Sequence, residues 1–347
     1  MRARALKYLL VFSLPLTAAV SFISFGWLTY LTLLYAFAVI PLLELVFPAS
    51  KTNLNSLEIE MVQNDRLYDV LLYLVVPIQW AMLVFFLISI QDGLSAADLT
   101  GRVLAMGILN GVFGINVAHE LGHRASKYEQ LLAKALLCTS LYMHFFIEHN
   151  QGHHKNVATE SDPASARKNE WIYTFWIRSL VMSYLGAWKI QLQSLKRKKA
   201  RFLSLENEML FYHIFQLGLI SGICLMFGFL GLYCFLTASL IGALLLETVN
   251  YIEHYGLRRQ KVNARRYENV KPTHSWNSNH VIGRLLLFEL SRHSDHHYQA
   301  AKPYQLLDHT KNAPQMPTGY PGMMLLSMFP PIWMLVMNGK LSKIQEE

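Results

Sequence analysis

Long uncharged runs dominate the pattern of hydrophobic and polar positions along this chain. No Asp, Glu, Lys or Arg occurs from Tyr8 to Leu43 or from Met209 to Leu246. A helix crosses a bilayer in about 20 residues, so each run is long enough for two crossings, with a glycine-containing break between them. Two shorter runs, Val70 to Gln91 and Val103 to Ala118, each suit one more crossing. The pattern predicts six transmembrane helices, at about residues 8–27, 28–47, 70–91, 103–123, 209–228 and 230–252.

The composition agrees with a membrane protein. Of the 347 residues, 53% are hydrophobic and only 16% are charged, and the mean hydropathy is +0.24. So little charge excludes a disordered chain and disfavours a soluble enzyme. The three cysteines lie far apart in apolar stretches, which predicts neither a disulfide framework nor a cysteine metal site. We expect an all-α, single integral-membrane domain, residues 1–347, whose helical cap comprises residues 124–208 and 253–347.

The positions of the charged residues along the chain indicate why the net charge is +8. If the N-terminus faces the cytoplasm, six crossings place every one of the 31 Lys and Arg residues except Arg102 on the cytoplasmic side. This asymmetry follows the positive-inside rule, and it predicts that both termini and the cap are cytoplasmic. The basic cluster from Lys196 to Arg201 then reads as an anchor to membrane lipids, so no nucleic acid is needed as a partner.

Nine of the 14 histidines are concentrated at or beyond the predicted cytoplasmic ends of the spans. Helical residues three or four apart lie on one face, so histidines at that spacing can aim at a common point. The histidines expected to do so are His119 with His123, His149 with His153, and His293 with His296 and His297. Adjacent residues diverge by about 100° on a helix, so His154 and one of His296 and His297 are expected to serve a second metal. His254 completes the nine.

Nine imidazoles exceed what one ion can hold, which predicts two metals. Iron is favoured, because nitrogen-ligated ferrous iron with an open position activates dioxygen. Copper is the weaker choice, since no Cys or Met lies within the clusters. The flanking carboxylates are expected mainly to accept hydrogen bonds from the outer imidazole nitrogens, and direct metal coordination by one of them stays open. These carboxylates are Glu120, Glu148, Glu253 and Asp295.

Other readings of the histidines are weaker. A lone H-E-x-x-H motif with Glu120 as base is typical of zinc proteases, but the further clusters disfavour that class. A metal transporter would need polar ligands inside the spans, whereas the histidines sit at their ends. We expect the isolated histidines to be structural or exposed, with His274 intermediate. The isolated residues are His144, His213, His280 and His309.

The clusters, in their order and context, resemble a known family. They are His119-Glu-Leu-Gly-His123-Arg124, Glu148-His149-Asn-Gln-Gly-His153-His154-Lys155 with Asp162-Pro-Ala-Ser165 behind it, Asn250-Tyr-Ile-Glu-His254-Tyr-Gly256, His274-Ser-Trp-Asn-Ser-Asn279 and Ser291-Arg-His293-Ser-Asp-His296-His297. Across roughly residues 116–307 the chain is similar to the membrane-bound alkane 1-monooxygenases. These are alkane hydroxylases with a non-haem diiron site, related to xylene monooxygenase and the fatty acid desaturases.

The resemblance implies more than the residues alone. It implies six transmembrane helices with a cytoplasmic histidine-rich cap in a bacterial inner membrane. It further implies hydroxylation of the terminal methyl of medium-chain alkanes to 1-alkanols, with dioxygen and with electrons from a rubredoxin that a rubredoxin reductase reduces. Two iron ions would be held by His119, His123, His149, His153, His154, His254, His293, His296 and His297. The family does not count His274 among the ligands.

Several alternatives stay open on sequence grounds. Membrane fatty-acyl desaturases carry similar histidine boxes, and a methylarene, a fatty acid or another lipid can replace the alkane as the hydroxylated substrate. An alkane-like substrate is expected to enter from the bilayer between the spans, because the protein must supply position and dryness for chemistry on an unactivated C–H bond. Leu33, Tyr35 or Phe37 would limit its length if the second span lines its path.

Overall fold

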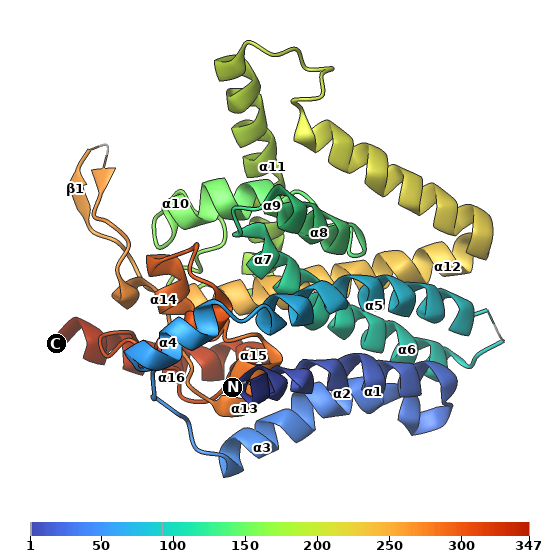
Figure 1. Cartoon of the computed structure of the whole chain (residues 1–347), viewed down its shortest axis with the longest axis horizontal. Coiled ribbons are helices and arrows are strands. Elements are labelled where there is room, and N and C mark those ends of the chain that lie inside the picture. The colour runs from blue at the N-terminus through green and yellow to red at the C-terminus, as the bar shows by residue number, and fades with distance from the viewer. Residues whose placement is uncertain (1, 92, 265, 347) are drawn as a thin grey trace.

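The computed structural model describes residues 2–91, 93–264 and 266–346. These residues are mostly helical, which confirms the predicted helical class (Figure 1). The only strands within these ranges form one short antiparallel hairpin, β1 (Lys261–Asn263) and β2 (Arg266–Tyr267). This hairpin is a small departure from the all-α expectation.

Within the described residues, five helical segments are long and apolar enough to cross a membrane, so the protein is a multi-pass membrane protein. They are Arg4–Ile23, Gly26–Val46, Leu67–Ser89, Ala96–Gly122 and Glu208–His254. The first four begin a few residues before the predicted ranges. The first comprises most of η1 (Arg2–Phe12) with α1 (Ser13–Ile23), and the second comprises η2 (Gly26–Tyr30), α2 (Leu31–Leu34), η3 (Tyr35–Val39) and α3 (Ile40–Val46). The third is α5 (Leu67–Ser89), and the fourth comprises α6 (Ala96–Leu109), η4 (Asn110–Ile115) and α7 (Asn116–Gly122).

The last two predicted spans, 209–228 and 230–252, belong to one element, α12 (Glu208–His254). With a rise of 1.5 Å per residue, its 47 residues extend for roughly 70 Å, which is more than twice the thickness of a hydrocarbon core. The backbone of Gly228 leaves the helical region, with φ 65° and ψ −170°. At this break α12 changes direction sharply between its yellow first half and its gold second half (Figure 1).

The second half of α12 packs unusually closely against the fourth span. A Cβ atom at Gly242 would lie 2.6 Å from Cβ of Asn110, and one at Gly107 would lie 2.5 Å from the side chain of Ile241. Small residues allow such close approach between helices in lipid, where no hydrophobic force drives helices together. Because His119 lies in the last turn of the fourth span and His254 ends α12, this contact fixes the relative position of two histidine-bearing segments.

The close contact predicts opposite effects for two alanine substitutions in the same helix. Gly242→Ala should lower the stability by about 1–3 kcal/mol, because the new methyl group overlaps Asn110. Gly222→Ala should leave the stability unchanged or raise it by up to about 1 kcal/mol, because open space surrounds Gly222 and alanine favours a helix. The thermal unfolding midpoints of both variants in detergent check this, and equal shifts would contradict the close packing.

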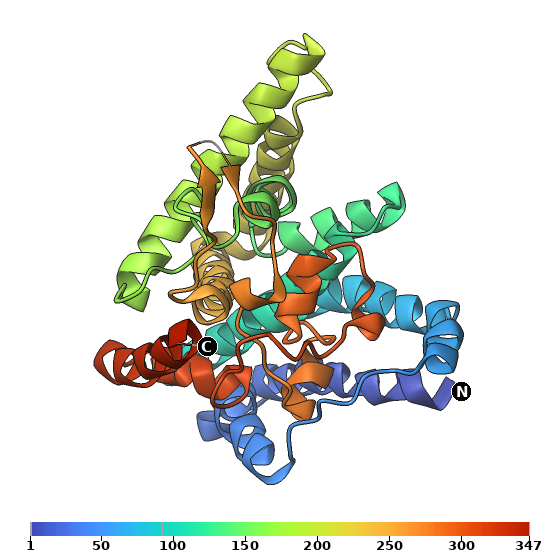
Figure 2. The ribbon, with the colours of Figure 1, turned by 90° about the vertical axis from the view of Figure 1, so that its left-hand side faces the viewer.

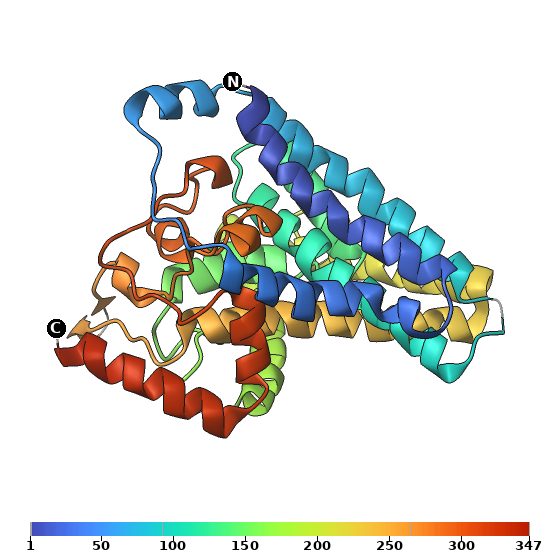
Figure 3. The same cartoon turned by 90° about the horizontal axis from the view of Figure 1, so that it is seen from below.

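The remaining elements gather around one end of the spans (Figure 3). Figure 2 looks onto this end, where α14 lies over the span ends while α11 extends away from them. Residues 320–339 form parts of two separate helices. The elements are α4 (Ser56–Gln63), α8 (Lys127–Cys138), α9 (Phe145–Glu148), η5 (His149–His153), α10 (His154–Asn156), α11 (Ile172–Lys198), η6 (Pro272–His274), α13 (Val281–Leu286), α14 (His293–Tyr298), η7 (Tyr304–Leu306), α15 (Tyr320–Ser327) and α16 (Pro330–Glu346).

Candidate metal centre

The nine histidines that the sequence singles out come together in two neighbouring groups. Within each group, one ring nitrogen from every member lies within 4.8 Å of the others. The five-histidine group is His119, His123, His149, His154 and His296, and the four-histidine group is His153, His254, His293 and His297. They come from α7, η5, α10, the end of α12 and α14, which are segments far apart in the sequence.

The spacing of the ring nitrogens is that of ligands around one ion. In the five-histidine group, Nε2 of His149 lies 3.1 Å from Nε2 of His123 and 3.0 Å from Nε2 of His154. In the four-histidine group, Nε2 of His153 lies 3.2 Å from Nε2 of His297. Metal–nitrogen bonds of about 2.1 Å place neighbouring ligand nitrogens about 3.0–3.4 Å apart, so both groups have the dimensions of a metal site.

A wide helical turn decides which histidines share a group. At η5 the N–H of His154 bonds to the carbonyl of His149, five residues earlier, so these two rings lie on one side of the helix. Such π-turns occur frequently at functional sites. The expectation that His149 and His153 aim at one point is therefore wrong, because His153 belongs to the other group.

Adjacent histidines belong to different groups, as the angle between neighbouring side chains on a helix predicts. His153 and His154 fall in different groups, and so do His296 and His297. On α14, His293 joins His297 rather than His296, which corrects the expectation that all three share one point.

Burial keeps the imidazoles in the neutral form that binds metals. It places the pKa of five of these histidines well below the ordinary value, and the neighbouring imidazoles lower the pKa further, because several positive charges cannot be accommodated together. This holds for His149, His154, His293, His296 and His297.

Asp162 makes a contact with one of the nine histidines that sequence reasoning did not predict. Its Oδ2 lies 2.9 Å from Nδ1 of His153 and accepts a hydrogen bond from Oγ of Ser165 at 2.5 Å. Burial raises the pKa of the Asp162 carboxyl, but the interactions with His153 and Ser165 outweigh burial and lower it. A carboxylate in this position fixes the orientation of a ligand ring. The sequence signal for this contact is the segment Asp162-Pro-Ala-Ser165, which on sequence grounds indicates only a family motif.

The carboxylates expected to support the imidazoles mostly have other partners. Glu120 accepts hydrogen bonds from Arg124, and Asp295 accepts one from Lys302 at 2.8 Å. Glu148 packs against Gly152 instead of an imidazole. None of these three carboxylates pairs with an imidazole within the described residues, so for them the expectation is wrong.

Glu253 does lie against a histidine, but on the side that faces the metal group. Its Oε2 is 3.1 Å from Nε2 of His293, and that same Nε2 lies 3.1 Å from Nε2 of His254. The other oxygen, Oε1, accepts a hydrogen bond from the Tyr320 hydroxyl at 2.7 Å. Glu253 therefore connects Tyr320 to the four-histidine group, in a position from which a carboxylate can reach a metal.

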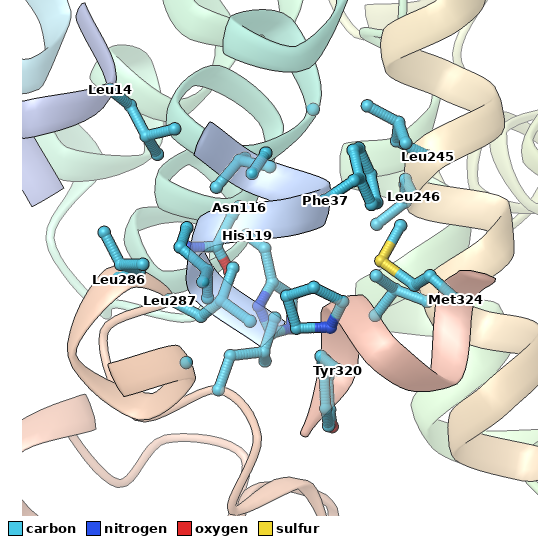
Figure 4. Close-up of a pocket in the computed structure, with 18 residues that line it drawn as sticks. Leu14, Phe37, Asn116, His119, Leu245, Leu246, Leu286, Leu287, Tyr320 and Met324 are labelled. Atoms are coloured by element: carbon cyan, nitrogen blue, oxygen red, sulfur yellow. The ribbon is translucent and has the colours of Figure 1, made fainter. Parts of the chain in front are cut away.

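An apolar cavity lies between the spans and ends at the five-histidine group (Figure 4). Its polar lining side chains are Asn116, His119 and Tyr320. The Nε2 atom of His119 is buried and has no hydrogen-bond partner within the described part of the chain, so it fits the role of a metal ligand. The apolar wall includes Leu14, Phe37, Leu245, Leu246, Leu286, Leu287 and Met324.

The second span lines this cavity with Ala36, Phe37 and Ile40, which are partly different residues from those that the sequence suggests. Phe37 lines it, as expected, but Leu33 and Tyr35 do not. The Tyr35 hydroxyl instead lies 2.7 Å from Oγ of Ser13 on the first span.

The five remaining histidines lie outside both groups, as expected. His274 accepts a hydrogen bond from the backbone N–H of Lys271 at 3.0 Å, and its other ring nitrogen lies 3.3 Å from Glu268. His213 contacts the hydroxyl of Tyr184. The others are His144, His280 and His309.

Comparisons with known proteins show the family of this chain. The family model described as fatty acid desaturase matches residues 97–327, so the chain belongs to this class of membrane proteins with histidine-rich sites. Alkane 1-monooxygenase 1 of Alcanivorax borkumensis is 39% identical over 92% of this chain and 82% of its own length. Alkane 1-monooxygenase of Pseudomonas putida is also 39% identical, over 93% of this chain and 83% of its own.

A more distant relative is the xylene/toluene monooxygenase hydroxylase component of Pseudomonas putida. It is 29% identical over 76% of this chain and 71% of its own length. Within the wider class, the chain belongs to the alkane 1-monooxygenase family. The family resemblance read from the histidine clusters is thereby confirmed.

Proposed function

We propose that this protein hydroxylates the terminal methyl group of medium-chain alkanes, giving 1-alkanols, with dioxygen as the oxidant. The observation that carries the proposal is the apolar cavity whose inner end is His119, a member of the five-histidine group. A chain without polar groups can be held there only by packing, and its end would meet the metal site. The names of the relatives support alkane as the substrate class.

We propose two iron ions as the cofactor, one in each histidine group. The ligand set would be the nine histidines His119, His123, His149, His153, His154, His254, His293, His296 and His297. Neutral, buried imidazoles at ligand spacing fit such ions, and Asp162 would hold the ring of His153 in place. Bound iron would supply the activation of dioxygen that no side chain can perform.

The residues of the chain position the substrate and exclude water. Leu245, Leu246 and Met324 form part of an apolar wall that would align an alkane with His119. Exposed apolar side chains on the spans, such as those of Leu225 and Phe229 on α12, suit contact with lipid, from which the substrate would enter. Tyr320 both lines the cavity and donates a hydrogen bond to Glu253, so it would hold that carboxylate beside the four-histidine group.

The topology in the membrane is part of this proposal. The break at Gly228 supports two crossings by α12 and therefore six in total. The distribution of Lys and Arg supports a cytoplasmic location for the termini and the histidine groups in a bacterial inner membrane. The net charge of +8 would favour the binding of an acidic electron donor on that side. We propose that this donor is rubredoxin, which rubredoxin reductase reduces.

A product assay tests this function. Membranes containing the protein are supplied with dioxygen, reduced rubredoxin and a mixture of alkanes, methylarenes and fatty acids. We expect 1-alkanols as the main product. An alkene product would favour a fatty-acyl desaturase, the activity for which the matching family model is named. A benzylic alcohol would favour the activity named for the xylene/toluene relative.

A further inference from the structure

A second cavity lies at the same end of the spans as the histidine groups. It lies between the start of the first span and the segment that leads into α14, and its lining is rich in cationic side chains. We call it the basic cavity. Its charged lining residues are the cations Arg4, Lys7, Arg284 and Arg292 and the acids Glu58 and Glu289.

The acids in the basic cavity leave part of its positive charge uncompensated. Glu58 pairs with Arg4. Glu289 alone faces the three other cations, because its oxygens lie 2.5 Å from Nε of Arg284, 3.6 Å from Nζ of Lys7 and 3.9 Å from Nε of Arg292. One carboxylate balances only one of these cations, so the cavity carries an excess of two positive charges.

Two buried polar atoms of the basic cavity lack hydrogen-bond partners among the described residues. They are Nε of Arg292, whose residue is 3% exposed, and Oε1 of Gln305, whose residue is 9% exposed. The other guanidinium nitrogens of Arg292 donate to the backbone carbonyls of Leu307 and Thr52, which fixes the side chain. Buried polar groups are almost always paired, so these atoms point to a ligand.

We propose that the basic cavity binds a phosphate group, either in the headgroup of an anionic phospholipid or as free phosphate. The excess positive charge suits an anion, and arginine nitrogens donate well to phosphate oxygens. The unpaired Gln305 oxygen suits a hydroxyl on the phosphate or the headgroup. A lipid can reach the site, because Arg4 and Lys7 begin the first span and their side chains are half exposed.

The bound phosphate would connect the membrane surface to the metal-binding cap. Arg292 directly precedes His293, the first residue of α14. Lys7 belongs to the first span, and the hydroxyl of Tyr8, beside it, donates to Glu289 at 2.7 Å. An anion held by both cations would therefore tie the first span to the start of α14.

Native mass spectrometry of the purified full chain tests this site without relying on enzyme activity. The probes are phosphatidylglycerol and phosphatidylcholine, and we expect selective retention of phosphatidylglycerol. Lys7→Gln should weaken its binding by about fivefold, the usual effect of one basic residue near an anionic headgroup. Lys127→Gln is the matched control, because it removes the same charge from an exposed position outside the cavity. Equal effects of the two substitutions would mean general surface attraction and would overturn the proposal.

Two further measurements complete the test. Gln305→Glu places a negative charge in the cavity with little change of shape, so it should also weaken phosphatidylglycerol binding by several-fold. If neither Lys7→Gln nor Gln305→Glu weakens binding, the site does not exist. Inorganic phosphate distinguishes the sources: competition with the lipid, lost in Lys7→Gln, supports the site with free phosphate as a ligand, whereas selective lipid binding without competition supports the site with a headgroup ligand.

Discussion

Replacing His254 by alanine is expected to abolish turnover and to lower the iron content from about two ions per chain to about one, if each histidine group holds one ion. His254 is fully buried, and its Nε2 lies 3.1 Å from Nε2 of His293. The four-histidine group would keep only three imidazoles, while the five-histidine group would stay complete. Elemental analysis of the purified variant and the product assay measure the two effects.

His274→Ala is the control for this experiment. His274 lies in the same cap and is also buried, but it contacts Lys271 and Glu268 and belongs to neither group. We expect the control to keep both ions. Retained turnover in His254→Ala would remove His254 from the ligand set, and zinc as the only metal in the wild-type protein would overturn the oxidase assignment.

Asp162→Asn should weaken iron binding or turnover by about 10–100-fold, the range found when a partner of a ligating histidine is lost. Asparagine has nearly the same shape as aspartate, but it lacks the charge that holds the proton on Nδ1 of His153. Iron retention during dialysis against a chelator measures the first effect, and the initial rate of product formation measures the second.

The matched control for Asp162 is Asp308→Asn. Asp308 pairs with Lys302 near the surface and touches neither histidine group, so this variant should behave as the wild type. If Asp162→Asn binds iron as tightly as Asp308→Asn and turns over as fast, Asp162 has no role in positioning His153.

Much of this architecture could be predicted because the bilayer imposes a simple rule on sequence. Uncharged runs predicted the long apolar helices, and the spacing of histidines along helices selected the nine that come together. Gly26 was correctly expected as a break, since its φ of 64° suits glycine at the turn between the first two spans.

The parts that sequence could not supply depend on tertiary contacts. The wide turn at η5 leaves no signature in residue spacing, so the pairing of His149 with His154 was missed. The wall of the apolar cavity depends on how α13 and α15 pack against the spans, which periodicity does not reveal.

Arg102 shows how such contacts resolve an apparent exception. It was the one cation expected on the far side of the membrane, yet it is only 2% exposed. Its guanidinium donates to the carbonyls of Ser24 and Ser89, at the ends of the first and third spans. Carbonyls at helix ends lack partners within the helix, so they can solvate a buried cation.

The division of adjacent histidines between the two groups has a consequence for engineering. His153 and His154, and likewise His296 and His297, are joined by a single peptide unit, yet the two members of each pair face different groups. The separation of the groups is therefore set by covalent geometry rather than by the packing of movable side chains. Substitutions in the apolar cavity are therefore expected to leave the distance between the two histidine groups unchanged.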